Sequence, residues 1–152
     1  MQKSIDKIYY AAIYLRLSKE DGDLSSGEKK ESNSIANQRK LIEDYLSRNP
    51  EITLVQEFCD DGYTGANFDR PDFQRMMEQV KTGKINCIIV KDLSRFGRDY
   101  IDSGRYIEKI FPSLGIRFIA INDNYDSAQS QQVGNEIILP FKNLINDSYS
   151  RD

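Results

Sequence analysis

The chain has 152 residues, of which 39% are hydrophobic and 30% charged, with no histidine and a formal net charge of −3. This composition is typical of one globular domain, and no apolar run approaches the roughly 18 residues that a membrane span requires. The net charge argues against the basic surface of an autonomous nucleic-acid-binding domain. Any contact with a nucleic acid must therefore be limited to a small part of the surface.

The two cysteines, Cys59 and Cys87, lie in apolar, strand-like runs and have no partner at metal-ligand spacing. We therefore expect buried thiols in a reducing cytoplasm and no structural zinc site. The first residues lack the charged and apolar regions of a signal peptide, which agrees with a cytoplasmic location.

An apolar run from Ile8 to Leu17 predicts a first strand that is buried on both faces of a parallel sheet. The polar, charged segment that follows, 19–32, predicts a loop. Helical spacing of apolar residues begins after Ser34, the expected N-cap, and stops at Asn49-Pro50.

A second strand, Ile52–Phe58, leads into a glycine-containing turn over 60–65. Pro71 then begins a helix at its favoured first position, and the apolar spacing of this helix continues to Val80. A third strand is predicted over Asn86–Lys91.

The helix after the third strand places Leu114 on its apolar face, with a kink or an early end predicted at Pro112. A fourth strand, Ile116–Ile121, precedes a polar stretch, 122–135, that we expect to be flexible. The last segment, 136–149, is amphipathic and predicts a helix.

The alternating order of strands and helices predicts an α/β fold of three layers, in which helices flank a mainly parallel central sheet. Such folds place their chemistry outside the carboxyl ends of the parallel strands. Several polar residues follow strand ends in this way: Arg16 and Ser18 after the first, Asp61 after the second, and Ser94, Arg95 and Arg98 after the third. We expect these residues to surround one crevice.

Arginines that converge on one strand end are suited to bind a phosphodiester. A guanidinium matches phosphate geometry with two hydrogen bonds and keeps its charge at every working pH. A serine nucleophile in a chain without histidine must be activated by another group. From the residues alone, the first hypothesis is therefore phosphoryl transfer at Ser18.

Four sequence blocks occur in order along the chain: Tyr14-x-Arg16-x-Ser18, Ser34-x-x-x-Gln38, Asp61-Gly62-x-x-Gly65 with Arg70-Pro71, and Leu93-Ser94-Arg95-Phe96-Gly97-Arg98-Asp99. Together these blocks resemble the catalytic domain of the serine recombinases, the resolvase and invertase superfamily. Within it, the chain is most similar to the large serine recombinases of mobile elements.

The resemblance implies a resolvase-like domain that performs site-specific DNA recombination. Ser18 would attack a backbone phosphate, form a 5′-phosphoserine link to DNA and release a 3′ hydroxyl, and religation to a new partner would complete strand exchange. The resemblance also implies no metal or nucleotide cofactor, DNA as a partner, and a homo-oligomer from dimer to tetramer. Arg16, Arg70, Arg95 and Arg98 match the family's phosphate-binding arginines, and Gln38 also matches its pattern.

The acid-base chemistry stays open at this point. Asp61 is a candidate for proton transfer or for fixing an arginine, and an aspartate that caps its own turn is an equal alternative. The Ser18 proton can go to a carboxylate, to water or to the phosphate itself. Small resolvases carry aspartate where this chain has Ser94. Ser94 also competes as a nucleophile, although its place before a helix favours an N-cap.

The expected domain comprises residues 1–152, with a core over 8–124, a flexible segment over 125–135 and the start of a truncated long helix over 136–152. By the same resemblance, a C-terminal DNA-binding region is missing. Two other functions stay open, a small-molecule phosphoryl-transfer enzyme and a catalytically silent domain used for assembly or regulation. The chain lacks the G-x-x-x-x-G-K-[ST] phosphate loop of the first class, and the retained serine and arginines argue against the second.

Overall fold

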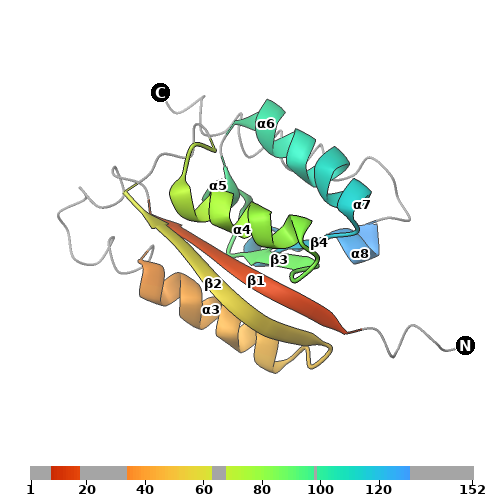
Figure 1. Ribbon diagram of the computed structural model, residues 1–152. Helices are drawn as coiled ribbons and strands as arrows, with labels where there is room; N and C mark the ends of the chain where they lie inside the picture. The colour runs from red at the N-terminus through yellow and green to blue at the C-terminus, as the bar shows by residue number, and fades with distance from the viewer. Residues whose placement is uncertain (1–7, 18–33, 63–67, 98, 131–152) are drawn as a thin grey trace, which may run out of the picture.

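The computed structural model describes residues 8–17, 34–62, 68–97 and 99–130. This part of the chain contains a five-stranded sheet in the order β2-β1-β3-β4-β5 (Figure 1). The four parallel strands are β1 (Tyr9–Leu17), β2 (Ile52–Asp61), β3 (Cys87–Val90) and β4 (Arg117–Ala120), and β5 (Tyr125–Asp126) pairs antiparallel with β4. The predicted α/β class with a mainly parallel sheet is confirmed.

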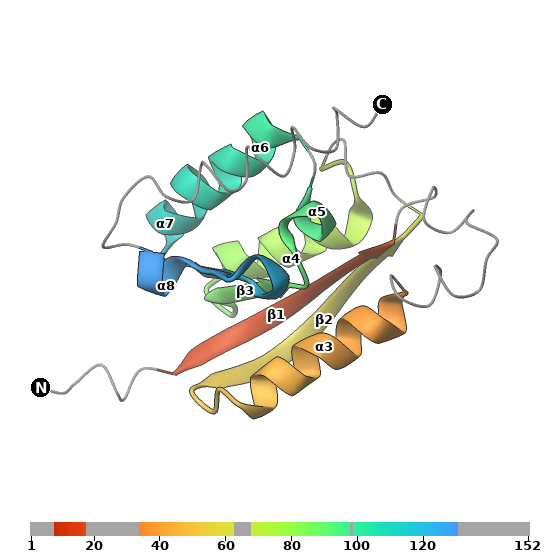
Figure 2. The same cartoon turned by 180° about the vertical axis from the view of Figure 1, so that it is seen from behind.

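The described helices are α3 (Ile35–Ser47), α4 (Pro71–Lys81), α5 (Leu93–Phe96), α6 (Tyr100–Arg105), α7 (Phe111–Leu114) and α8 (Ser127–Ser130). Helix α3 lies on one face of the sheet, and α4, α6 and α7 lie on the opposite face (Figures 1 and 2). The two layers of helices and the sheet between them are the three predicted layers. Of these described helices, none is long and apolar enough to cross a membrane.

Strand β1 forms the centre of the core because its side chains alternate between the two faces of the sheet. Ala12 and Tyr14 belong to the apolar cluster under α4, α6 and α7. Ile13 and Leu15 instead pack with Ile42 of α3. The prediction that this strand is buried on both faces is therefore confirmed.

The pairing of β1 with β2 contains one extra residue, Val55. Ala11 lies opposite Leu54, and the next residue of β1, Ala12, lies opposite Gln56. An extra residue of this kind is a β-bulge, and it reverses which face each later side chain of the strand occupies. Strand β2 also extends to Asp61, three residues beyond its predicted end.

Two predicted helix starts are confirmed. The Asn37 N–H donates to Ser34 Oγ at 3.1 Å, so Ser34 is the N-cap of α3. Helix α4 begins at Pro71, and its predicted apolar positions, including Phe73 and Val80, are buried.

Of the two alternatives predicted at Pro112, a kink or an early end of the helix, the early end is wrong. The helix passes through Pro112 to Leu114 and ends at Gly115, whose φ of 74° is a left-handed conformation that glycine adopts without strain. A π-helical turn over Tyr106–Ile110 precedes the proline and joins α6 to α7. This wider turn accommodates a proline ring, which would clash with the carbonyl four residues back in a regular helix. Leu114, predicted on the apolar face, is 44% exposed.

The polar stretch predicted to be flexible from residue 122 contains regular structure as far as Ser130, namely β5 and α8. Arg117 of β4 donates to both carboxylate oxygens of Asp126 at 2.9 and 2.5 Å. This buried ion pair links β5 to β4. The hydrophobic periodicity of the sequence does not predict it. The predictions for 19–32, 63–65, 131–135 and 136–152 lie outside the described residues.

Candidate active site

Four of the predicted site residues lie at the carboxyl end of β1: Arg16 near the end of that strand, Gln38 on α3, Arg70 directly before α4, and Arg95 on α5. Two others, Ser18 and Arg98, lie outside the described residues. At the end of β1, the described site residue is Arg16.

Gln38 holds the backbone of Arg16. The Arg16 N–H donates to Gln38 Oε1 at 3.2 Å, and Gln38 Nε2 donates to the Arg16 carbonyl at 2.9 Å. Strand β3 pairs with β1 over Ala11–Ile13, so the backbone of β1 near Arg16 needs other partners on that side. The fully buried amide of Gln38 takes the place of a neighbouring strand.

The guanidinium of Arg16 holds α5. It donates through Nε to the Arg95 carbonyl at 3.0 Å and through Nη2 to the Ser94 carbonyl at 2.5 Å. In return, Arg95 Nη1 donates to the Arg16 carbonyl at 3.0 Å. Arg16 is 0% exposed and Arg95 is 7% exposed. The two arginines therefore fix each other's position across the end of β1.

Arg70 holds the next carbonyl of the same helix. Its Nη2 donates to the Phe96 carbonyl at 2.8 Å, and its Nη1 donates to the Tyr14 hydroxyl at 3.0 Å. The guanidinium lies over the ring of Phe68, 4.5 Å from its centroid, and burial lowers the pKa of Arg70. Arg70 is 1% exposed, so it supports α5 from the interior of the protein.

Three successive carbonyls of α5, those of Ser94, Arg95 and Phe96, thus accept hydrogen bonds from buried arginines. A helix of four residues leaves most of its carbonyls without partners inside the helix, and these carbonyls carry partial negative charge. The arginines satisfy that need. The position of α5 relative to β1 is consequently set by charged side chains rather than by apolar packing alone.

A buried carboxylate completes the arrangement below Arg70. The Tyr14 hydroxyl donates to Asp60 Oδ2 at 2.7 Å, and Asp60 also accepts the N–H groups of Asp72 and Phe73 at 2.9 and 3.0 Å. Burial is the main cause that raises the pKa of Tyr14, so the phenol stays protonated and donates. Asp60 is buried, whereas the predicted candidate Asp61 is exposed at the end of β2.

The N-terminus of α5 is capped by Asp92. Asp92 Oδ1 accepts the Arg95 N–H at 3.0 Å and the Ser94 hydroxyl at 2.6 Å. The expectation that Ser94 is the N-cap is wrong, because the helix already begins at Leu93 and Ser94 is its second residue.

The turn after α5 requires a glycine for steric reasons. A Cβ atom at Gly97 would lie 2.6 Å from Phe68 Cζ and 2.7 Å from Ser103 Oγ, closer than real Cβ contacts. Phe68 is itself packed against the rings of Phe73, Phe96 and Tyr106. The close approach of this turn to α6 therefore depends on Gly97.

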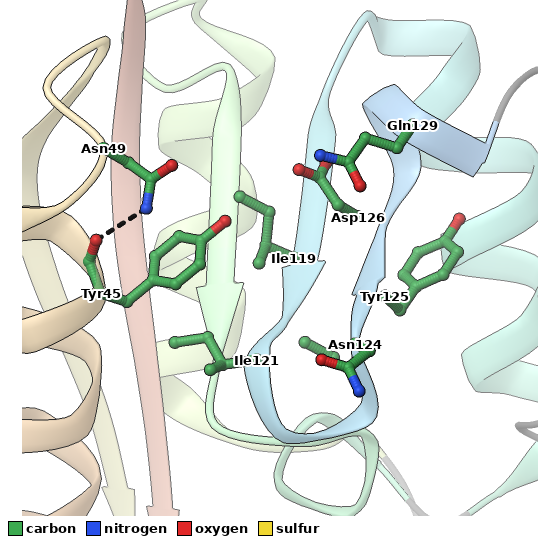
Figure 3. Close-up of a pocket in the computed structure, with 9 residues that line it drawn as sticks. Tyr45, Asn49, Ile119, Ile121, Asn124, Tyr125, Asp126 and Gln129 are labelled. Atoms are coloured by element: carbon green, nitrogen blue, oxygen red, sulfur yellow. Dashed lines mark hydrogen bonds between the residues drawn. The ribbon is translucent and has the colours of Figure 1, made fainter.

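A separate hollow lies between α3 and the β4–β5 end of the sheet (Figure 3). Tyr45 of α3 and Asn49, which follows the end of that helix, form one wall, and Asp126 and Gln129 lie on the other side (Figure 3). Arg16, the centre of the site above, is not among its lining residues. Across the described ranges, no group of three or more aspartate, glutamate or cysteine side chains is placed to hold a metal ion.

Sequence reasoning missed Tyr14, Asp60 and Asp92 as members of the site. Tyr14 stands in the first sequence block but had no assigned role. Asp60 shares the face of β2 with Phe58, so alternation along the strand could have distinguished it from Asp61. Asp92 precedes a helix by one residue, which is the pattern of an N-cap.

Residues 11–150 match the family model described as the resolvase N-terminal domain. The fold is similar to that of the N-terminal catalytic domain of TP901-1 integrase, with a TM-score of 0.71 and 20% identity over 94% of this chain and 98% of the other. A resolvase family site-specific recombinase from Streptococcus pneumoniae gives a TM-score of 0.65 and 25% identity, covering 95% and 90% of the two chains.

The C-terminal catalytic domain of ISC1926 TnpA, an IS607-like serine recombinase, gives a TM-score of 0.56 and 21% identity, covering 73% of this chain and 69% of the other. No curated protein sequence matches the chain.

Proposed function

Because the chain belongs to the resolvase family of serine recombinase catalytic domains, we propose that it cleaves and rejoins DNA at specific sites, in a transposon or other mobile element. The observation that carries the proposal is the pair of interlocked arginines, Arg16 and Arg95, at the end of the strand that leads to Ser18. Positive charge held beside a serine suits attack on a phosphodiester.

In the proposed reaction, the Ser18 oxygen bonds to the phosphorus and the bond from phosphorus to the 3′ oxygen breaks. The serine proton is lost and the 3′ oxygen gains one, so a phosphoserine at the 5′ end and a 3′ hydroxyl result. Attack of a 3′ hydroxyl from another duplex end on the phosphoserine reverses the step and restores Ser18. The phosphoserine conserves the energy of the broken bond, so no nucleotide is consumed.

Arg16, Arg95 and Arg98 are the proposed phosphate-binding residues, since charge on the phosphate oxygens increases as the serine oxygen approaches. Donors arranged in advance around such charge each contribute about 2.7–4 kcal/mol in a site from which water is excluded. Arg70 stays a proposed phosphate-binding residue that, like the buried Arg16, also holds a carbonyl of α5, and for Gln38 we propose support of β1. For Asp61 we keep the proposal of proton handling, with Asp60 as the carboxylate that supports Arg70 through Tyr14.

The proposed partners are DNA and further copies of the chain. Exchange between two duplexes requires four strands to be cut, and one serine cuts one strand, so four subunits are needed. The domain itself has a formal charge of −3, and much of its affinity for DNA must therefore come from outside this domain.

The test is a covalent adduct between the natural full-length protein and DNA that carries the end sequences of its own element. We expect an adduct that survives denaturing electrophoresis and disappears in the Ser18→Ala variant. That variant should fold and bind DNA like the wild type, because a hydroxyl at a strand end contributes little to the core. If the wild type binds and assembles on this DNA but forms no adduct, the domain is catalytically silent and the proposal fails.

A further inference from the structure

Helix α5 is one turn long, and charged side chains hold it at both ends. Arg16 and Arg70 bind its carbonyl groups, as described above. At the other end, two aspartates bind its N–H groups: Asp92 accepts the Arg95 N–H, and Asp123 Oδ2 accepts the Leu93 N–H at 2.7 Å. The orientation of Arg95 therefore depends on several contacts outside its own helix.

The two aspartates differ in what else they contact. Asp92 Oδ1 lies 2.6 Å from the Ser94 hydroxyl and 3.9 Å from Arg95 Nε, in addition to its bond with the Arg95 N–H. The Arg95 guanidinium also donates through Nη1 to the Arg16 carbonyl. The guanidinium thus lies between the Asp92 carboxylate and the end of β1.

The ion pair of Arg95 and Asp92 is largely shielded from water. The Arg95 side chain is 8% exposed and that of Asp92 is 23% exposed. Charges shielded from water in this way interact more strongly than the exposed pairs of a protein surface. By contrast, the exposed pair of Arg48 and Asp44 has side chains that are 65% and 69% exposed.

We propose that Asp92 is a positioning residue for Arg95, and that the Ser94 hydroxyl fixes the rotamer of the Asp92 carboxylate for that purpose. The inference rests on the proposed function, since Arg95 is there a phosphate-binding residue. Position 94 of this chain carries a hydroxyl instead of a carboxylate, and Asp92 brings a carboxylate oxygen within hydrogen-bond distance of that hydroxyl. Asp92, held by the Ser94 hydroxyl, then supplies the negative charge beside Arg95.

The test uses Asp92→Asn in the full-length protein, with adduct formation on DNA as the readout. Asparagine caps a helix about as well as aspartate, so the variant keeps the N-cap and loses only the charge. We expect an unchanged melting temperature, DNA binding within twofold of wild type, and adduct formation slower by roughly 10- to 100-fold, as for a misplaced reactive group. Asp92→Asn with Ser94→Asp, which returns a carboxylate next to Arg95, should recover most of the lost rate.

Asp123→Asn is the matched control, because it alters a carboxylate at the same helix end that bonds to Leu93 instead of Arg95. We expect this control to form the adduct at the wild-type rate. Asp92→Asn with wild-type adduct formation, or a double variant without recovery, would overturn the positioning role. Equal slowing in the Asp123→Asn control would do the same, since it would indicate a general effect of negative charge at this helix end. Absence of an adduct with the wild-type protein would instead contradict the proposed function.

Discussion

At the scale of single residues, the site is built from buried charged and polar side chains whose hydrogen bonds go mainly to backbone groups. Arginine and glutamine are seldom fully buried in proteins, because removing their polar groups from water is costly unless each is bonded. Gln38 satisfies this condition through the backbone of Arg16, and Arg16 satisfies it through the carbonyls of α5. Substitution of either residue therefore affects the partners left behind as well as the side chain removed.

We predict that Gln38→Met lowers the free energy of unfolding by about 1–3 kcal/mol. Methionine has a similar shape, but the Arg16 N–H loses its bond to the Gln38 amide, and the Arg16 carbonyl loses the Gln38 donor while it keeps the bond from Arg95. Gln56→Met is the control, because Gln56 is exposed on β2 and should change stability by less than about 0.5 kcal/mol. Denaturant unfolding of both variants measures the difference. Equal stability of the two variants would show that water replaces the Gln38 amide.

At the scale of elements, short segments position the site, and the long elements provide the frame. Helices α3 and α4 and strand β1 were predicted from the sequence because each has a clear hydrophobic period and a clear start or end residue. Helix α5 has only four residues, too few for a period, and its position depends on arginines from distant parts of the chain. Its contacts were therefore beyond prediction from local sequence.

We predict that Gly97→Ala lowers the free energy of unfolding by about 1–3 kcal/mol. The added methyl group would overlap Phe68, which neighbouring rings hold in place. The matched variant is Gly104→Ala in α6, where nothing lies within 4 Å of the new Cβ. This control should be neutral or more stable by about 0.5–1 kcal/mol, because alanine favours the helix. The midpoints of denaturant unfolding test the pair, and a stable Gly97→Ala protein would contradict the steric argument.

The difference between local sequence patterns and contacts from distant parts of the chain also explains which site residues were predicted. The arginines and Gln38 were identified because they occur in sequence blocks that resemble a known family. Asp60 and Asp92 were not, because the predicted second strand ended at Phe58 and the helix start was expected after Ser94, whereas β2 extends to Asp61 and α5 begins at Leu93. The sequence blocks located the site, and the backbone geometry decided which carboxylates belong to it.

At the scale of the whole molecule, two apolar clusters on opposite faces of the sheet enclose β1. At the β4–β5 edge of the sheet, a buried ion pair joins the two strands. Arg117 and Asp126 have side chains that are 10% and 9% exposed. The Arg117 guanidinium also lies over the ring of Tyr9, 4.7 Å from its centroid, and its hydrogen bonds to Asp126 raise its pKa. This ion pair links β4 with β5, and through Tyr9 it reaches the first strand.

We predict that Asp126→Ala lowers the free energy of unfolding by about 3–5 kcal/mol, because it leaves the buried Arg117 charge without its carboxylate partner. Asp44→Ala is the control, since it removes an exposed ion pair and should cost at most about 0.5 kcal/mol. Thermal and denaturant unfolding of the two variants provide the comparison. A small loss in Asp126→Ala would mean that Glu51, 3.9 Å from Arg117, takes over.

The extra residue in β2 determines how this chain can be compared with others. Before Val55, Ile52 faces α3, and after it Phe58 and Asp60 face the opposite side. In a strand without the bulge, Asp61 would face the tyrosine of β1 and Asp60 would face α3. An alignment without a gap at this position therefore pairs residues on opposite sides of the sheet, beyond Val55, whenever one of two chains lacks this residue. Equivalent residues of this strand in two chains have to be identified by the face of the sheet on which they lie, not by their position in the sequence.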